Sequence, residues 1–244
     1  MSRLTLAALA VSSALTLPAF AQDDDGWYVS GFVGAGFAND ADLRGTQNPV
    51  AGAPGTVGDP ARVQAEFDSD STIGVALGYK TPWEFFGLFN TRLELEYSTL
   101  SVDVSDGSFN GGNQSFGGDA DIDFFLIYNY IDIIWDYYQT LIPYVGGGLG
   151  IANVDANILY AGGGAVDPNF VVTGEDSGLA STFAGGLTWL TGTPWEVYGE
   201  ARYYQIRDLE FDRRFIGNGE NLFNAEVDDD FDGTSLTIGA RYKF

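Results

Sequence analysis

Charged residues recur at every second position in three stretches of the sequence. In the first stretch, Arg92, Glu94 and Glu96 alternate with apolar or aromatic residues. Residues at alternate positions of a β-strand share one face, so strands would bring these charges together in an interior. There they could form an ion-pair network that fills the space, or they could line a path for water and small ions. The candidate residues of this network are Arg92, Glu94, Glu96, Glu200, Arg202, Arg241 and Lys243.

A second group with possible chemistry is the acidic run that precedes the last stretch of the chain. Asp228, Asp230 and Asp232 alternate, and Gly233 takes the sixth position, which partly matches a calcium-binding loop. The position that should hold the closing glutamate is Gly239, and a strand pattern follows instead of a helix. A solvated acidic loop is therefore favoured over a metal site, and no cofactor is expected.

The composition excludes several functions. The chain has no Cys and no His, which removes disulfides, the usual zinc sites and nucleophiles that depend on histidine. Carboxylate pairs for glycosidase-type hydrolysis exist, but nothing in the sequence sets their separation, so we expect no enzymatic activity. The formal net charge of −23 argues against nucleic acid as a partner. It fits a soluble surface or cation-mediated contact with an anionic glycolipid.

The element that positions the charged residues is clearest at the end of the chain, from Ser235 to Phe244. Here Leu236, Ile238, Ala240, Tyr242 and Phe244 fall on one face, and polar residues or glycine fall on the other. A strand with a wholly apolar outer face would promote aggregation in water. Its length and alternation are typical of a tilted strand that crosses a lipid bilayer.

The start of the chain resembles an export signal. A basic residue, an apolar run and an Ala-x-Ala motif predict a secretory signal peptide over residues 1–21, followed by one barrel domain over 22–244. No later apolar run is long enough for a membrane helix, so any crossing must use strands.

The whole pattern predicts an all-β fold, an eight-stranded antiparallel up-and-down barrel that spans a membrane. Four long segments rich in Gly, Asn and Asp are predicted as extracellular loops, and they alternate with short periplasmic turns. The register of strand 121–135 stays open, because both of its faces are apolar. The predicted strands cover residues 26–37, 71–80, 89–104, 121–135, 142–151, 178–189, 195–211 and 235–244, and the predicted loops cover 38–70, 105–120, 153–177 and 212–232.

The tryptophans support this topology. All of them fall at strand ends that it assigns to the periplasmic side, as expected of an aromatic girdle at one membrane interface. They are Trp27, Trp83, Trp135, Trp189 and Trp195.

Several motifs resemble small eight-stranded outer-membrane proteins, the group of opacity proteins and porin-family surface antigens, related in fold to the OmpA transmembrane domain. These motifs are Gly26-Trp27-Tyr28-Val29, Leu77-Gly78-Tyr79, the stretch from Arg92 to Tyr97, the stretch from Pro143 to Gly150, and Arg241-Tyr242-Lys243-Phe244. The resemblance implies the outer membrane of a Gram-negative bacterium. It also implies an assembly signal at Tyr242 and Phe244 that is read by the barrel assembly machinery. The expected partners are outer-membrane lipid, lipopolysaccharide and an extracellular ligand bound by the loops.

Two functions are open at this point. The first is a surface antigen, adhesion or envelope-integrity protein whose lumen is closed by ion pairs, which is the favoured reading because unpaired buried charge is costly. The second is a narrow porin-like channel for water, ions or small solutes. A soluble lipocalin-like carrier would need an apolar interior and a polar exterior, the reverse of the pattern in strands 89–104, 195–211 and 235–244.

Overall fold

A computed structural model describes residues 25–136 and 139–244, and the predicted signal peptide lies outside them. Most of the described chain is in strands, in agreement with the predicted all-β fold. No helix in this part of the chain is long and apolar enough to span a membrane. The strands are β1 (Gly26–Ala38), β2 (Ala41–Gln47), β3 (Pro60–Asp68), β4 (Asp70–Phe85), β5 (Phe89–Phe109), β6 (Gly112–Asn113), β7 (Phe116–Ile133), β8 (Leu141–Tyr160), β9 (Phe170–Leu190), β10 (Trp195–Phe215) and β11 (Leu222–Lys243).

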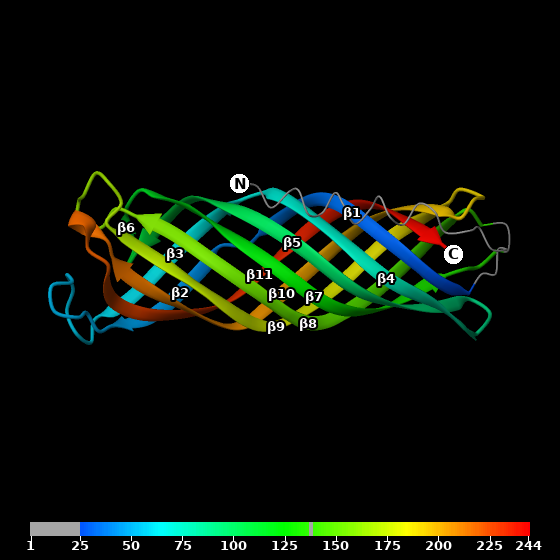
Figure 1. Cartoon of the computed structure of the whole chain (residues 1–244), viewed down its shortest axis with the longest axis horizontal. Coiled ribbons are helices and arrows are strands. Elements are labelled where there is room, and N and C mark those ends of the chain that lie inside the picture. Colours follow the sequence, from blue (N-terminus) through cyan, green and yellow to red (C-terminus); the bar gives the residue numbers. More distant parts are fainter. Residues whose placement is uncertain (1–24, 137–138) are drawn as a thin grey trace.

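The strands close into an antiparallel barrel. Following the ladders in order gives β1-β4-β5-β7-β8-β9-β10-β11, and β11 then pairs with β1 from Tyr28↔Lys243 to Ala38↔Gly233. Figure 1 shows the strands tilted along a long barrel. The end that holds Phe244 and the residues 86–88, 134–136, 139–140 and 191–194 is called the turn end, and the opposite end is called the far end.

The four predicted loops are wrong over most of their length. The described residues form eleven strands: eight close the ring given above, and β2, β3 and β6 lie in segments predicted as loops. β5, β7, β8, β9, β10 and β11 also continue beyond their predicted ends. β2 pairs with β11, β3 pairs with β5, and β2 and β3 pair with each other, so these two strands continue the barrel wall where β1 and β4 stop. At the far end, the segments outside strands are 39–40, 48–59, 110–111, 114–115, 161–169 and 216–221.

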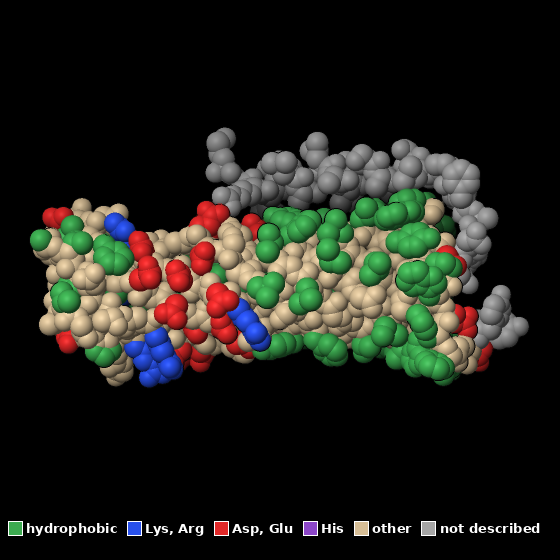
Figure 2. All heavy atoms as spheres, turned by 90° about the horizontal axis from the view of Figure 1, so that it is seen from below, with side chains coloured by type: hydrophobic (Ala, Val, Ile, Leu, Met, Phe, Trp, Pro, Cys, Tyr) green, Lys and Arg blue, Asp and Glu red, His purple; other side chains and the backbone are tan. Residues whose placement is uncertain are grey.

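The loop prediction was wrong because the polarity of the two faces of the strands reverses along the barrel. Apolar residues face outward near the turn end and inward near the far end. Near the turn end, apolar residues face outward, as in Ile127, which is 61% exposed. Nearer the far end of the same strand, β7, Asp121 faces outward and Ile122 is completely buried. We call these parts the apolar-coated section and the acid-coated section, and Figure 2 shows them side by side on the barrel surface. The second pattern is typical of a barrel in water, so a search for apolar outer faces does not find it.

A β-bulge in β10 changes which residues of this strand face inward. The ladder to β11 shifts register between Ile206 and Leu209, where Asp208 has a φ of 61°. Before the bulge, even-numbered residues such as Tyr204 face inward, and after it Leu209 and Arg213 do. An extra residue in one strand moves every later side chain to the opposite face.

The interior of the acid-coated section is an apolar core. Small and branched side chains from β2, β3, β5, β7, β8, β10 and β11 fill it, at positions where acidic residues alternate on the outside. Its fully buried members include Val63, Leu100, Val102, Ile122, Val154, Ile158, Ile206, Leu209 and Val227. This core resembles the inside of a soluble protein more than the lumen of a pore.

The structure also defines the register of β7, which the sequence left open. Leu126, Tyr128 and Tyr130 face the interior, and Phe125 and Ile127 face outward. Both faces are apolar because the interior of this section contains stacked tyrosines, with the rings of Tyr128 and Tyr130 centred 5.1 Å apart.

Candidate functional site

The seven charged residues predicted to face inward all lie inside the barrel. They come from alternate positions of β5, β10 and β11, three strands with the same polar-in pattern near the turn end. Lys243 is the most accessible of them, with 27% of its side chain exposed at the turn end. The other six are each 8% exposed or less.

The turn-end cluster is the first of two groups of ion pairs. Its centre is Arg92, which pairs with Glu94 and donates from Nε to Asp132 Oδ1 at 3.1 Å. The hydroxyl of Tyr28 donates to Glu94 at 2.5 Å. Arg92 bonds to two carboxylates and Glu94 accepts from two donors, so the cluster behaves as a network.

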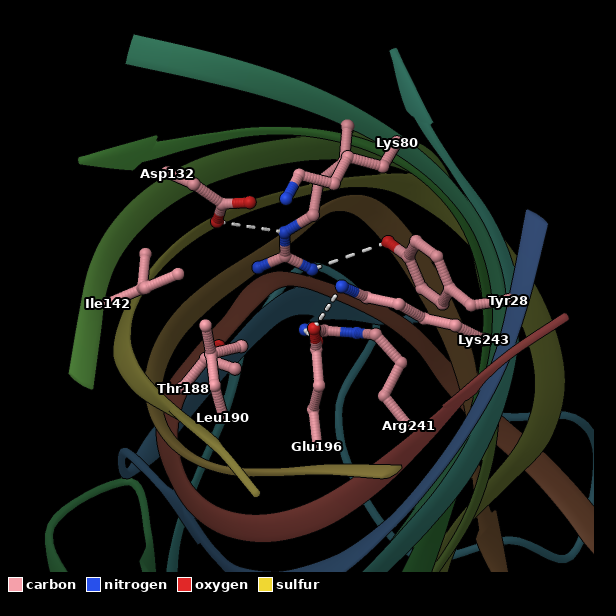
Figure 3. A pocket seen from close by; sticks show the side chains of 10 residues that line it. Tyr28, Lys80, Asp132, Ile142, Thr188, Leu190, Glu196, Arg241 and Lys243 are labelled. Carbon is pink, nitrogen blue, oxygen red and sulfur yellow. Dashed lines mark hydrogen bonds and ion pairs between the residues drawn. The ribbon is translucent and has the colours of Figure 1, made fainter. Parts of the chain in front are cut away.

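Glu196 extends the turn-end cluster to the last strand. Its two oxygens accept from Arg241 at 2.9 Å and from Lys243 at 2.6 Å. Arg241 also lies 3.6 Å from Glu94, which joins the two halves of the cluster. Figure 3 shows Glu196, Arg241 and Lys243 converging on one region of the interior, with Tyr28 and Asp132 beside them.

The second group, the Arg202 cluster, lies next along the barrel. Two guanidinium nitrogens of Arg202 donate to the two oxygens of Glu96 at 2.5 and 2.8 Å, and its Nε pairs with Glu200. Ser98 donates to Glu96 at 3.0 Å. A guanidinium that meets a carboxylate with two parallel bonds is the strongest geometry for such a pair.

Aromatic rings cover the arginines of both clusters. The Arg92 guanidinium lies 4.1 Å from the ring centre of Tyr130, and Arg202 lies 4.5 Å from that of Phe32. Ring faces attract cations, more strongly where water is excluded. The rings also fill the space between the ion pairs, so the interior of the apolar-coated section is packed with side chains.

The charges inside the apolar-coated section balance. Each buried cation can be matched with one carboxylate, which limits the energetic cost of placing so many ions away from water. The cations are Lys80, Arg92, Arg202, Arg241 and Lys243, and the carboxylates are Glu94, Glu96, Asp132, Glu196 and Glu200.

Four members of the turn-end cluster were not among the predicted site residues. Glu196, Lys80 and Tyr28 sit on inward faces that the alternation had already identified, so their positions could have revealed them. Asp132 could not be found in this way, because the apolar residues on both faces of β7 hide its register.

A fourth buried arginine closes the far end of the barrel. Arg213 is 2% exposed, although it lies in a segment predicted as a loop. Its Nε donates to the Tyr160 hydroxyl at 2.5 Å, and it also bonds to Asn224. Its guanidinium lies 4.1 and 4.2 Å from the ring centres of Phe109 and Phe170. Burial lowers the pKa of Arg213 from its ordinary value.

The cavities between these layers are very small. One beside the turn-end cluster leaves about 10 Å³ for the centre of a water molecule, and one beside the Arg202 cluster leaves about 20 Å³. A third, within the apolar core, leaves about 20 Å³. Each is comparable to the space of one or two water molecules.

The model of one protein family, described as the outer membrane protein beta-barrel domain, matches residues 7–244. The chain belongs to this family. Membership accounts for the apolar outer face near the turn end, which contacts lipid in the outer membrane of a Gram-negative bacterium. No curated protein sequence is significantly similar to the chain.

Solved outer-membrane barrels have a similar fold. The outer membrane protease OmpT from Escherichia coli is 10% identical with a TM-score of 0.51, and the match covers 94% of this chain and 99% of OmpT. The outer membrane protein OprG from Pseudomonas aeruginosa is 19% identical with a TM-score of 0.45, covering 90% and 96%. Neisserial surface protein A is 13% identical with a TM-score of 0.42, covering 90% and 97%. At these identities the likeness concerns the fold alone.

In this outer-membrane barrel, the aromatic residues predicted to form a girdle lie at the turn end. Trp27 packs on Tyr79 with ring centres 5.1 Å apart, and Trp195 packs on Tyr242 at 4.9 Å. Phe244 follows the last residue of β11 and is 39% exposed. All five tryptophans are exposed on the outer surface: Trp27, Trp83, Trp135, Trp189 and Trp195.

The acidic run that partly resembled a calcium loop is part of strand β11. Asp228 and Asp230 face outward from an extended backbone, with the buried Val227 and Phe231 beside them in sequence. Alternate residues of a strand lie about 6 to 7 Å apart, so the backbone does not fold their carboxylates around one point as a binding loop does. Asp232 accepts a hydrogen bond from Asn39 at 2.7 Å. Across the residues that the structure describes, no group of three or more His, Cys, Asp or Glu is arranged to hold a metal ion.

Proposed function

We propose that this protein is a non-enzymatic, non-conducting surface protein of the outer membrane, with a role as a surface antigen, in adhesion or in envelope integrity. The observation that carries the proposal is the filled interior. From the turn end onward, a path through the barrel meets the turn-end cluster, the Arg202 cluster, the apolar core and the Arg213 cap. An ion would have to displace buried ion pairs and then lose its hydration in an apolar core.

The acid-coated section is the part that we propose for recognition outside the membrane. Its strands hold acidic side chains on a rigid wall, where Asp103 and Asp119 lie opposite each other, as do Asp121 and Asp155. A partner would therefore meet a fixed arrangement of charges in place of mobile loops. The complementary partner is cationic, or is an anionic surface reached through divalent cations, such as lipopolysaccharide.

Assembly through the last residues is a separate part of the proposal. Tyr242 faces outward against Trp195, and the aromatic side chain of Phe244 remains partly exposed. We propose that this aromatic end is read by the barrel assembly machinery. Truncation of Phe244 would then slow the appearance of folded barrel in cells, while refolding of the purified chain in detergent would change little.

Planar-bilayer recording tests the closed lumen. Purified protein, first shown to be folded by the faster migration of the unboiled band in a detergent gel, should give no steady current. The narrow porin-like channel is the competing function. It predicts a unitary current that changes when Glu94→Gln or Arg202→Gln alters the charges along the path. A steady current of this kind would replace the surface-protein proposal with the channel.

A further inference from the structure

The far end of the barrel contains the only two asparagine–glycine pairs in the sequence, Asn110 with Gly111 and Asn218 with Gly219. The first pair joins β5 to β6, and the second lies in the short 3-10 helix Gly217–Gly219 between β10 and β11. Figure 1 shows both segments at the end opposite the C-terminus. Glycine has no side chain to shield its backbone nitrogen, so this nitrogen can attack the side-chain amide of the asparagine before it. Each pair is therefore a candidate site of deamidation.

Deamidation changes the asparagine in two steps. First, the glycine nitrogen bonds to the Cγ atom of the asparagine, the bond from Cγ to Nδ2 breaks, and Nδ2 leaves as ammonia with the proton that the glycine nitrogen carried. Water then hydrolyses the cyclic imide at one of its two carbonyls, which gives aspartate or isoaspartate. The reaction consumes water and releases ammonia, and it needs no oxidant or reductant. It requires a side-chain amide that is free to turn onto the glycine nitrogen.

The side-chain amide of Asn110 is held away from its glycine. Its Oδ1 accepts from the backbone nitrogen of Arg62 at 2.9 Å, and its Nδ2 donates to the carbonyl of Pro60 at 2.9 Å. Its backbone nitrogen donates to the carbonyl of Arg62 at 2.9 Å. The pair forms a two-residue hairpin turn in which both residues have positive φ, a conformation that asparagine and glycine favour. Attack on Asn110 must therefore break both side-chain hydrogen bonds.

Asn218 has no such restraint. It is partly exposed, and within the part of the chain that the structure describes its side chain has no hydrogen bond or ion pair. Its φ of 57° and ψ of 23° must change before the glycine nitrogen can reach Cγ, and the glycines on both sides permit that rotation. Nothing lies within 4 Å of the position that a Cβ would take at Gly111 or at Gly219, so the two glycines are equally accessible. The difference between the pairs lies in the asparagine side chains.

We propose that Asn218 deamidates spontaneously in the folded barrel, whereas Asn110 is protected. Each event adds a negative charge between β10 and β11, and isoaspartate also lengthens the main chain there. The inference holds for a surface protein and for a channel alike, because it depends only on the structure of the far end. In the proposed function, the change falls on the surface that the protein presents outside the cell.

Peptide mapping by mass spectrometry tests the proposal on the full chain folded in detergent. During incubation at mildly alkaline pH, Asn218 should convert about tenfold or more faster than Asn110, because two hydrogen bonds must open at Asn110. In urea, where the barrel is unfolded, both pairs should convert at similar rates. Equal rates in the folded barrel would overturn the proposal. A difference of the same size in urea would also overturn it, since the fold would then not be the cause.

Two variants assign the reaction to one residue. Asn218→Gln lengthens the side chain and disfavours closure of the ring, so release of ammonia by the folded barrel should fall to a small fraction of the wild-type rate. Asn221→Gln is the matched control, because Asn221 lies in the same connection but bonds to Arg214 at 2.7 Å and precedes Leu222. It should release ammonia as the wild type does. Unchanged release in Asn218→Gln would contradict the site, and if this variant fails to fold, the peptide map of the wild type decides.

Discussion

Glu96 and Arg202 form an ion pair across the full diameter of the barrel. They lie on β5 and β10, four strands apart in either direction around the ring, and 106 residues apart in sequence. Two hydrogen bonds of 2.5 and 2.8 Å join them. This contact ties opposite walls of the barrel together, in addition to the ladders between neighbouring strands.

Removal of one partner of this pair should therefore be severe. Arg202→Met leaves Glu96 and Glu200 buried without their cation, and a broken buried pair typically costs about 3 to 5 kcal/mol. We expect the urea midpoint, followed by tryptophan fluorescence, to fall accordingly. The double variant Arg202→Met with Glu96→Met should recover part of this loss. Arg214→Ala, which breaks an exposed pair with Asp212, is the control and should cost less than about 1 kcal/mol.

Two isoleucines on β7 should respond differently to the same substitution. Ile122 is completely buried in the apolar core of the acid-coated section, and Ile127 faces outward in the apolar-coated section. Ile122→Ala should destabilise the barrel by about 2 to 5 kcal/mol, because it leaves a cavity. Ile127→Ala leaves no cavity and should cost less than half as much in lipid vesicles. Similar losses at both positions would contradict the assignment of the two sections.

Glycines inside the barrel make room for the aromatic side chains that fill it. A Cβ at Gly78 would lie 2.1 Å from Tyr28 Cζ, so Gly78→Ala should displace the hydroxyl that donates to Glu94. We expect a loss of about 1 to 3 kcal/mol from overpacking. Gly31→Ala is the control, because the nearest atom to its Cβ would be 3.7 Å away. For both variants, the fraction of folded barrel is measured as the fraction of protein with heat-modifiable migration in detergent gels.

Asp119 should make the barrel more stable as pH falls through the pKa of its carboxyl group. Burial, and then the neighbouring carboxylates Asp121, Asp103 and Asp155, raise the pKa of Asp119 above its ordinary value of 3.8. A carboxyl group whose pKa is higher in the folded state stabilises the fold below the unfolded pKa, and this contribution is lost as pH rises through the folded pKa.

Asp119→Asn should therefore raise the urea midpoint at about pH 7 and reduce its change between about pH 4 and pH 7. Added salt should reduce the difference in urea midpoint between Asp119→Asn and the wild type, because salt screens like charges on the surface. Asp59→Asn, in the connection between β2 and β3, is the control. If the urea midpoint of Asp119→Asn changed more steeply with pH than that of the wild type, this would contradict repulsion between Asp119 and its neighbouring carboxylates.

The sequence was most informative where the outer face contacts lipid. Alternation placed Arg92, Glu94 and Glu96 inside and the neighbouring Leu93 and Leu95 outside, as the structure shows. A residue that faces lipid must be apolar, so the pattern there is strict.

In the acid-coated section, Asp, Asn, Ser and Gly on the outer face resemble the composition of loops. Their buried partners are often as small as Ala120 or Ala156, so the apolar side of the alternation is weak as well. The bulge at Asp208 then breaks the period within β10. The Arg213 cap was missed for the same reasons, because its position follows from the changed register and from contacts with distant strands.

Part-way along the strands, the solvent around the barrel changes from lipid to water. The chain has no Cys, so single substitutions along β7 give unique labelling sites. In intact cells, a membrane-impermeant maleimide should label Asp121→Cys rapidly and should leave Ile127→Cys unlabelled until the membrane is dissolved. Protection at 121, or rapid labelling at 127, would contradict a barrel whose acidic half stands in water and whose apolar half stands in lipid.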